Sequence, residues 1–572
     1  MDTRSKDGKR RGGVRHLMAT IAVGVALLGA SPALAQVSIS VNPTLPGDIP
    51  GGASTASLQQ AAAFAWQEFI ALNWPAQSGQ RDQANASLPF GTQTGPLVWE
   101  TLRGKVEIFP GNGNSNVGPP GYTPTGGPSY GYNTPPTYTY AVPVPPCPGQ
   151  TAPGQPAWIN LDETTQIGLD RMFSGASPLV AAQNSQPQLI RFLAKANHVE
   201  YAYVAANQFW YNGSTSPVYT ASQNFVTSIR QSPPVFPSGP SVNFPAGTVE
   251  VKAGWRKLGP TEDPTRYHSQ TVRFYENKTA KHTVCYFEDT WALVALHIIQ
   301  KTPSAPSFIY ATFEQADNIV LPNGQPIEDT NGNVVNAPSA ATPTTPDLTY
   351  TDSPTSPVVA VNPTGAPFCP PPSPSVPNHR LFYLETQAPG LPSGGRICVN
   401  SRDNPIASDI IQVNMAAHSA IQSYSASNGI KKSPWQFYKL VSVQQQPFDI
   451  SKIAPTPSTM APAVFFQANI AVETDFTLQQ FRGRIFGGSG PPTSYPSGGF
   501  APPPNVYSAV QPAPQAQGVN MGGCMGCHGN AQVAGFDFSF ILKGGPDREP
   551  ETPSATSVAV AHLRYLDLLK SH

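Results

Sequence analysis

Five short runs between residues 248 and 313 decide the fold: TVEVKAGW (248–255), TVRFY (271–275), TVCYF (283–287), WALVALHIIQ (291–300) and SFIYATF (307–313). They are rich in β-branched and aromatic residues, which favour strands, and turn-forming residues separate them. Their polar and apolar residues alternate in the manner of strands with one buried face. We therefore predict that these runs form the sheet of a buried core.

Helices are predicted in three places outside these runs. Residues 57–73 place Leu58, Ala62, Ala65, Phe69 and Leu72 three or four positions apart and end before Pro75, which is the spacing of one helix face. Residues 188–209 and 406–425 are the other two candidates. The predicted fold class is therefore α+β, with a β-rich and loop-rich main body.

The chain has 65 proline and 49 glycine residues among 572, so about one fifth of it forms turns or breaks helices. These residues gather in three tracts, at 109–157, 335–378 and 485–518, which lack sustained hydrophobic periodicity. We interpret the tracts as long excursions or linkers. The first contains several tyrosines, so we expect it to lie against the body.

A signal of another kind lies near the C-terminus, where Cys524-Met525-Gly526-Cys527-His528 forms a C-x-x-C-H motif. This is the pattern by which c-type haem is attached. Two thiols at this spacing can form thioethers to the two vinyl groups of one porphyrin, and the adjoining imidazole can reach the iron. We predict one covalently bound haem c, with Cys524 and Cys527 as attachment residues and His528 as the proximal iron ligand.

The N-terminus has the three parts of a secretory signal peptide. Basic residues from Arg4 to Arg15 precede an apolar segment from Leu17 to Ala30, and Ala33-Leu34-Ala35 forms an A-x-A cleavage site. The apolar segment is shorter than the roughly 20 residues that a membrane span needs. We expect residues 1–35 to be removed and the mature protein to be periplasmic, without a stable membrane anchor.

The C-terminal region resembles the beginning and end of a small c-type cytochrome. The resemblance rests on the C-x-x-C-H motif, the following Gly529, and a predicted helix at 557–569 that contains Tyr565, Leu566 and Leu569. It implies a short helical cytochrome c-like segment at residues 501–572, after a main body at 36–500. Three segments of the body also resemble large, mostly uncharacterised bacterial proteins with one C-terminal C-x-x-C-H: 250–256, 291–303 and 311–318.

The sequence does not decide which residue supplies the sixth iron ligand. Small cytochromes of the family that this region resembles take it from a methionine downstream of the motif, and no methionine follows Met525. His562, in the predicted terminal helix, could face the haem or the solvent. His297 lies in an apolar strand, where a hydrogen-bonded core imidazole is the competing interpretation. An open position, suited to small-molecule or peroxide chemistry, is the remaining alternative.

The other cysteines are Cys147, Cys285, Cys369 and Cys398. In an oxidising compartment they allow two disulfides in three connectivities, and a Cys369–Cys398 bond would close the shortest loop. We predict that such bonds restrain the long excursions. Among the charged residues, Glu314 is expected to anchor a loop beside Arg256 rather than to form a catalytic pair with Asp317.

Three classes of function fit these observations. The first is a periplasmic monohaem protein that passes single electrons to a redox partner protein. The second is a haem-dependent oxidoreductase that acts on a small molecule in a cavity of the large body. The third is a disulfide-stapled binding or structural protein without haem.

Two features limit the other classes. The formal net charge is zero and becomes slightly negative once residues 1–35 are removed, which disfavours a nucleic-acid partner. The sequence has no G-x-S-x-G, P-loop or H-E-x-x-H motif. Hydrolase and nucleotide chemistry therefore lack support.

Overall fold

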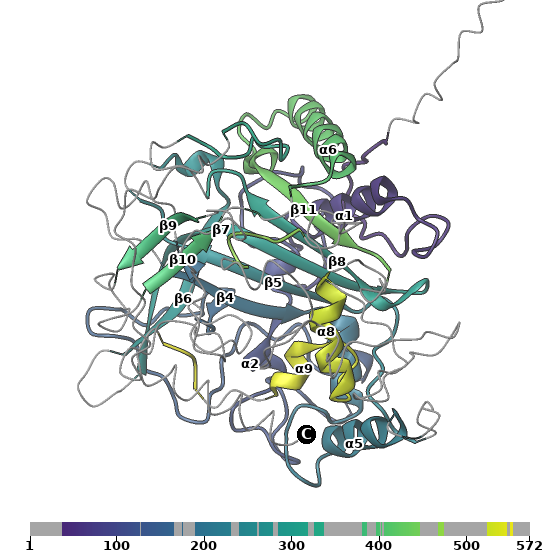
Figure 1. Ribbon diagram of the computed structural model, residues 1–572. Helices are drawn as coiled ribbons and strands as arrows, with labels where there is room; N and C mark the ends of the chain where they lie inside the picture. Colours follow the sequence, from purple (N-terminus) through teal and green to yellow (C-terminus); the bar gives the residue numbers. More distant parts are fainter. Residues whose placement is uncertain are drawn as a thin grey trace, which may run out of the picture. The chain divides into compact units, whose positions relative to one another are not determined.

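The predicted strands join one large sheet in the computed structural model of the protein (Figure 1). Nine strands of this sheet are described, in the order β1-β4-β5-β7-β6-β2, with β3 beside β4, β8 beside β7 and β11 beside β8. Their bounds are β1 Arg103–Gly104, β2 Ile159–Leu161, β3 Ser174–Gly175, β4 Leu189–Ala196, β5 Val249–Arg256, β6 Ser269–Asn277, β7 Val284–Thr302, β8 Ala305–Gln315 and β11 Tyr438–Gln444. Neighbouring strands are antiparallel except β2 and β6.

The structure describes these residues: 37–125, 127–164, 174–175, 189–229, 231, 239–259, 262–277, 284–318, 325–336, 380–385, 396–400, 402, 405–446, 467–473, 523–545 and 549–552. The predicted signal peptide, Cys369, the predicted terminal helix at 557–569 and His562 lie outside them. So do the tract at 485–518 and nearly all of the tract at 335–378. The fold is α+β with a dominant sheet, as predicted.

The five predicted runs occupy four strands. Three runs match β5, β6 and β8, but the runs at 283–287 and 291–300 form the single strand β7, so the separation predicted between them is wrong. Residues 288–290 continue the ladder because they pair with residues 271–273 of β6. The charge of Asp289 stays at the surface, where it pairs with Lys257.

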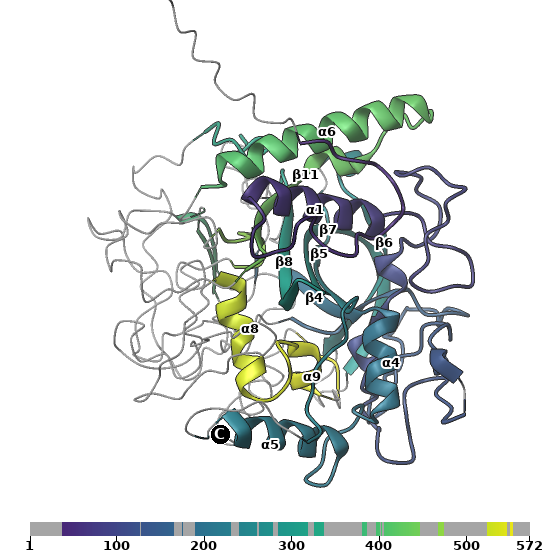
Figure 2. The same ribbon diagram turned by 90° about the vertical axis from the view of Figure 1, so that its right-hand side faces the viewer.

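The two faces of the sheet differ in polarity. On β5, Val249, Val251 and Ala253 belong to the main hydrophobic core, whereas Glu250 and Lys252 alternate with them and point to the opposite face. Helices α1 (Leu58–Leu72) and α6 (Ser408–Ser427) cover the apolar face, and the C-terminal segment lies elsewhere on the sheet (Figure 2). One face thus builds the main core, and the other combines polar side chains such as Glu250 and Lys252 with smaller hydrophobic clusters.

Two of the three predicted helices are confirmed. At the start of α1, Ser57 Oγ accepts a hydrogen bond from Gln60 N at 3.2 Å, and Gln60 Oε1 accepts one from Ser57 N at 2.9 Å, which is a capping box. Trp66 Nε1 donates to Asn414 Oδ1 at 2.8 Å. This buried bond joins α1 to α6 over the sheet.

The helix predicted at 188–209 is wrong in its first half. Residues 189–196 form β4, which pairs with β5 and β1, and only α4 (His198–Ala206) is helical. Asn197 separates the two, because its side chain accepts a hydrogen bond from Glu200 N at 3.2 Å and caps α4. Pairing within the sheet overrides the local helical pattern.

The excursion at 109–157 lies against the body, as predicted. Tyr132 and Tyr140 are buried, and the disulfide Cys147–Cys285 ties the end of the excursion to β7. Of the three possible connectivities, this bond leaves Cys369 to pair with Cys398, which stays a prediction because neither of these side chains is described. The 3₁₀ turn η2 (Gly127–Ser129) is the regular element described within this excursion.

The C-terminal segment consists of α8 (Gly523–Val533) and α9 (Phe540–Gly544). It belongs to the same compact unit as the sheet, residues 37–572, and the boundary predicted near residue 500 lies outside the described residues. No described helix is both long enough and apolar enough to span a bilayer. The remaining elements are α2 Lys105–Ile108, α5 Pro217–Ile229, β9 Arg380–Glu385, β10 Arg396–Asn400, and the 3₁₀ turns η1 Trp99–Thr101, η3 Pro264–Arg266 and η4 Pro434–Phe437.

Candidate functional site

The C-x-x-C-H motif lies at the start of α8, which is held against the sheet by its own residues. Met525 is fully buried, in a hydrophobic cluster with Phe308, Tyr310 and Phe538. Its backbone N–H donates to Gln444 Oε1 of β11 at 3.0 Å. Cys524 is half-buried, and one helical turn separates it from His528, so both residues lie on the same side of α8.

His528 is oriented by a single hydrogen bond. Its Nδ1 lies 2.7 Å from the carbonyl oxygen of Phe538, and because a carbonyl only accepts, Nδ1 must carry the proton. The Nε2 of a neutral ring then has a lone pair, and no described residue hydrogen-bonds to it. Metal-binding histidines are usually held in this way, by a donor bond from the other nitrogen.

The surroundings keep His528 neutral and restrict its ring. Burial lowers the pKa of His528 to about 4, the Phe538 carbonyl opposes this shift, and the positive charge of Lys252 adds to it. The ring of Tyr310 lies 4.9 Å from the imidazole, and Phe540 packs edge-to-face at 4.8 Å. The imidazole is therefore available as a neutral ligand at neutral pH.

Cross-strand pairing places two rows of side chains on the sheet face that carries α8. One row contains Lys252, His297, Thr312 and Ser442, and the next contains Glu250, Ile299, Tyr310 and Gln444. The rows are two residues, about 7 Å, apart along each strand. Because Gln444 and Tyr310 contact α8, the row with His297 lies directly beside the motif.

His297 is a half-buried imidazole whose Nε2 atom is shielded from solvent and unused. Its Nε2 has no hydrogen bond among the described residues, and Glu473 Oε1 lies 3.8 Å away, too far for one. Burial, followed by the charges of Lys252 and His528, lowers the pKa of His297 to about 3. Among the described residues, Nε2 thus has no partner of the kind that a hydrogen-bonded core imidazole would need, and the choice between that interpretation and an iron ligand stays a prediction.

Glu473 reaches His297 from a short described segment, residues 467–473. Asn469 N donates to Glu473 Oε2 at 2.8 Å, and Asn469 Nδ2 donates to Thr312 Oγ1 at 2.9 Å. Burial raises the pKa of Glu473 to about 8. With both side chains neutral near pH 7, the contact between Glu473 and His297 is not an ion pair.

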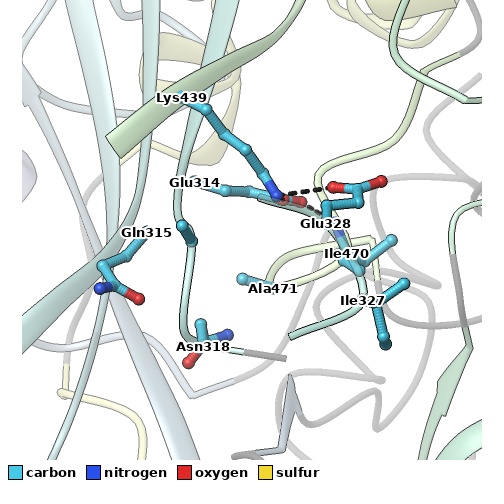
Figure 3. A pocket seen from close by; sticks show the side chains of 9 residues that line it. Glu314, Gln315, Asn318, Ile327, Glu328, Lys439, Ile470 and Ala471 are labelled. Carbon is cyan, nitrogen blue, oxygen red and sulfur yellow. Dashed lines mark hydrogen bonds and ion pairs between the residues drawn. The ribbon is translucent and has the colours of Figure 1, made fainter. Parts of the chain in front are cut away.

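A buried ionic cluster holds that segment in place. Glu314 accepts a hydrogen bond from the backbone N–H of Ile470 and pairs with Arg402 at 2.7 Å. Arg402 and Lys439 also bind Glu328, at 2.9 and 2.6 Å, as Figure 3 shows for the lysine. Burial alone would raise the pKa of Glu328, but these two cations hold it at about 2.

This cluster ties segments of the fold together and leaves little free space beside it. The cavity beside it, shown in Figure 3, has a volume of about 10 Å³, which is roughly the least that holds one water. The expectation that Glu314 lies beside Arg256 is wrong, because Arg256 pairs with Glu262 at 2.6 Å and bonds Asn318 at 2.8 Å. Asp317 pairs with Arg266, so Glu314 and Asp317 form no catalytic pair.

Carboxyl groups gather beneath the segment that follows α8. Glu200 is completely buried, and neither of its carboxyl oxygens lies within hydrogen-bonding geometry of a described residue. Glu250 of β5 is also buried, with 5% of its surface exposed. Asp537 pairs with Lys301 at 2.7 Å. Burial and mutual repulsion raise the pKa of Glu200, and burial raises that of Glu250 to about 7.

These shifts predict how stability depends on pH. The folded pKa of each glutamate lies above the unfolded value of about 4.5, so the stabilising contribution is complete below that value and is lost as pH rises toward the folded pKa, which is about 7 for Glu250. We expect the protein to lose up to about 1.4 kcal/mol per pH unit and per group over that rise in pH. In urea unfolding, the double variant Glu200→Gln/Glu250→Gln should show a free energy of unfolding that depends less on pH. Glu549 is exposed, so the control variant Glu549→Gln should show the same pH dependence as the parent protein. Parallel profiles for all three proteins would contradict this assignment.

In the described parts of the chain, no group of three or more His, Cys, Asp or Glu residues is arranged to hold a metal ion. Two imidazole nitrogens on this side of the sheet, His528 Nε2 and His297 Nε2, have no hydrogen bond to a described residue. Neutral imidazole nitrogens of this kind are ligands that a haem iron would accept, since haem supplies four of the iron's ligands itself.

A larger hollow of about 330 Å³ lies elsewhere, along α6. It is bordered by Asn331, Met415 and His418, and both nitrogens of His418 are engaged, at 2.7 Å with Asn331 Oδ1 and 2.8 Å with the Tyr438 carbonyl. Because α6 covers the apolar face of the sheet, this hollow is not part of the site at α8.

Sequence reasoning identified the motif and His297 but missed the residues around them. These are Lys252, Tyr310, Gln444, Glu473, Phe538 and Phe540. A signal for Lys252 was present, since Glu250 and Lys252 alternate with apolar residues in a buried strand. Glu473 and Phe540 had none, because only the folded chain brings them to His297 and His528.

No protein-family model, curated protein or solved structure matches this chain. Its function must therefore be inferred from the residues of the site.

Proposed function

We propose that this protein is a periplasmic c-type haem protein that transfers single electrons. Cys524 and Cys527 would hold one haem, and His528 would be its proximal ligand. The observation that carries the proposal is the bond from His528 Nδ1 to the Phe538 carbonyl, which leaves Nε2 of a neutral ring available. The motif predicts His528 as the proximal ligand, and the bond to Phe538 supports that role independently of the motif.

The described residues have definite parts in this function. Tyr310 and Phe540 limit rotation of His528, and Met525 anchors α8 in the core beside the sheet. The haem would supply the iron that cycles between two oxidation states. In this proposal, α8 and α9, together with the predicted helix at 557–569, form the short cytochrome c-like segment.

The proposed location follows from two observations. The sequence predicts a signal peptide at residues 1–35, and the Cys147–Cys285 disulfide is typical of proteins in oxidising compartments. A redox partner protein in the same compartment would supply or accept the electron. The slightly negative mature chain disfavours nucleic acid as that partner.

The test is the absorption spectrum of the full chain, produced in a periplasm with haem-attachment machinery, after oxidation, after reduction and after addition of carbon monoxide. We expect c-type bands that stay with the protein after denaturation. The reduced spectrum should be unchanged by carbon monoxide. Absence of haem, when a control cytochrome matures in the same cells, would overturn the proposal in favour of the disulfide-stapled binding or structural protein.

A haem-dependent oxidoreductase is the second candidate, and one observation favours it. Glu473 is a buried carboxyl whose pKa is raised to about 8, and it lies beside His297 on the face of the sheet that carries α8. Such a group can give a proton to a small molecule bound nearby. In this case carbon monoxide should bind to the reduced protein and shift its spectrum.

A further inference from the structure

His297 occupies a central position on the face that carries α8. It lies on β7 between Lys252 of β5 and Thr312 of β8. The same face carries Tyr310 in the adjacent row, and the Tyr310 ring is 4.9 Å from His528. Strand geometry therefore places His297 about 7 Å along the sheet from the residue row that touches His528.

The Nε2 atom of His297 lacks the partner that a buried nitrogen normally has. It is inaccessible to solvent and has no hydrogen bond among the described residues, and the carboxyl of Glu473 stays 3.8 Å away. An unsatisfied buried polar group destabilises the folded state. A ligand that engages Nε2 would remove that cost.

The other described histidines do not combine these properties. His268 Nε2 lies 2.7 Å from Glu100 Oε1, and both nitrogens of His418 are engaged. His198 also has a buried, unbonded Nε2, but it belongs to α4 and its ring packs 4.8 Å from Tyr132. Among the described histidines, His297 alone combines an unused nitrogen with a position beside His528.

We infer that His297 supplies the sixth ligand of the iron through Nε2, opposite His528. The inference rests on the proposed attachment of haem at Cys524 and Cys527. It assigns a closed, six-coordinate iron to the protein, and thereby selects electron transfer over small-molecule chemistry. His297 comes from the middle of the sheet and His528 from α8, so the iron joins the body to the C-terminal segment.

The test compares ferric electron paramagnetic resonance and carbon monoxide binding in the haem-loaded full chain. The parent protein should be low-spin and should not bind carbon monoxide. His297→Gln should become high-spin, bind one carbon monoxide per haem when reduced, and return to low-spin with added imidazole. His297→Met, which keeps a possible ligand, should stay low-spin with a higher potential and serves if the glutamine variant does not mature. His198→Gln is the matched control and should behave as the parent.

Other outcomes distinguish a wrong sixth ligand from an absence of covalent haem. Haem attached to a His297→Gln protein that stays low-spin would overturn the sixth-ligand assignment and leave the proposed function intact. The same holds if His562→Gln, and not His297→Gln, becomes high-spin. A parent protein without covalent haem would overturn the proposed function itself.

Discussion

Replacing Cys524 and Cys527 together with alanine should abolish covalent haem retention. In the proposed function each thiol would form one of two thioethers to the haem, so no covalent link would remain once both thiols are removed. The change removes only two sulfur atoms near the start of α8. We therefore expect the fold to persist, with a loss of unfolding free energy no larger than about 1 kcal/mol. Intact mass spectrometry after acidic acetone extraction measures the retained haem.

Two control variants make this result specific. Cys147→Ser/Cys285→Ser also removes two sulfur-bearing residues, but from the disulfide of the excursion, and should keep its haem. His528→Ala should keep the thioethers and lose the proximal ligand of the iron, so its absorption spectrum should change while the mass that haem adds to the chain stays the same. Full haem retention by the double alanine variant would contradict the assignment of the attachment residues.

Lys301→Met should destabilise the protein by about 3–5 kcal/mol, because it leaves a buried carboxylate without its cation. Lys301 Nζ lies 2.7 Å from Asp537 Oδ2, and both side chains are at most 5% exposed. Burial raises the pKa of Asp537, and the positive charge of Lys301 makes this increase smaller. Without the lysine, Asp537 must take up a proton or leave its site beside Glu200 and Glu250.

The loss in Lys301→Met should depend on pH and on position. It should be larger at pH 8 than at pH 5, because a raised folded pKa makes Asp537 lose stability as pH rises. Asp537 belongs to the segment after α8, so amide hydrogen exchange should accelerate most in residues 523–545. Urea unfolding and hydrogen-exchange mass spectrometry measure the two effects.

The same substitution at Lys257 is the matched control. Lys257 and Asp289 form an ion pair whose side chains are 47% and 44% exposed, and exposed pairs contribute at most about 1 kcal/mol. Equal losses for Lys257→Met and Lys301→Met would show that the C-terminal segment is not held by a buried charge pair.

Hydrophobic spacing predicted helices and strands correctly where the residues that stabilise an element are neighbours in sequence. Helix α1 could be placed within one residue at each end, since its apolar spacing and its capping residue are local. The strands β5, β6 and β8 were predicted for the same reason. The pattern failed at residues 189–196, which look helical but pair with β5, and at residues 288–290, where pairing with β6 continues β7 through polar residues.

The sequence by itself determined three features of this protein: the C-x-x-C-H motif, a dominant sheet, and four cysteines suited to disulfides. These depend on residue type and short spacing, which need no folded chain to be read. Only the tertiary structure decided which residues surround the motif. Glu473, Lys252 and His297 come from segments far apart in sequence, and the sheet register and the burial of their side chains bring them to the face that carries His528. Proximity and pKa arise from that burial, because the free energy of a charge depends on its surroundings and not on its neighbours in sequence.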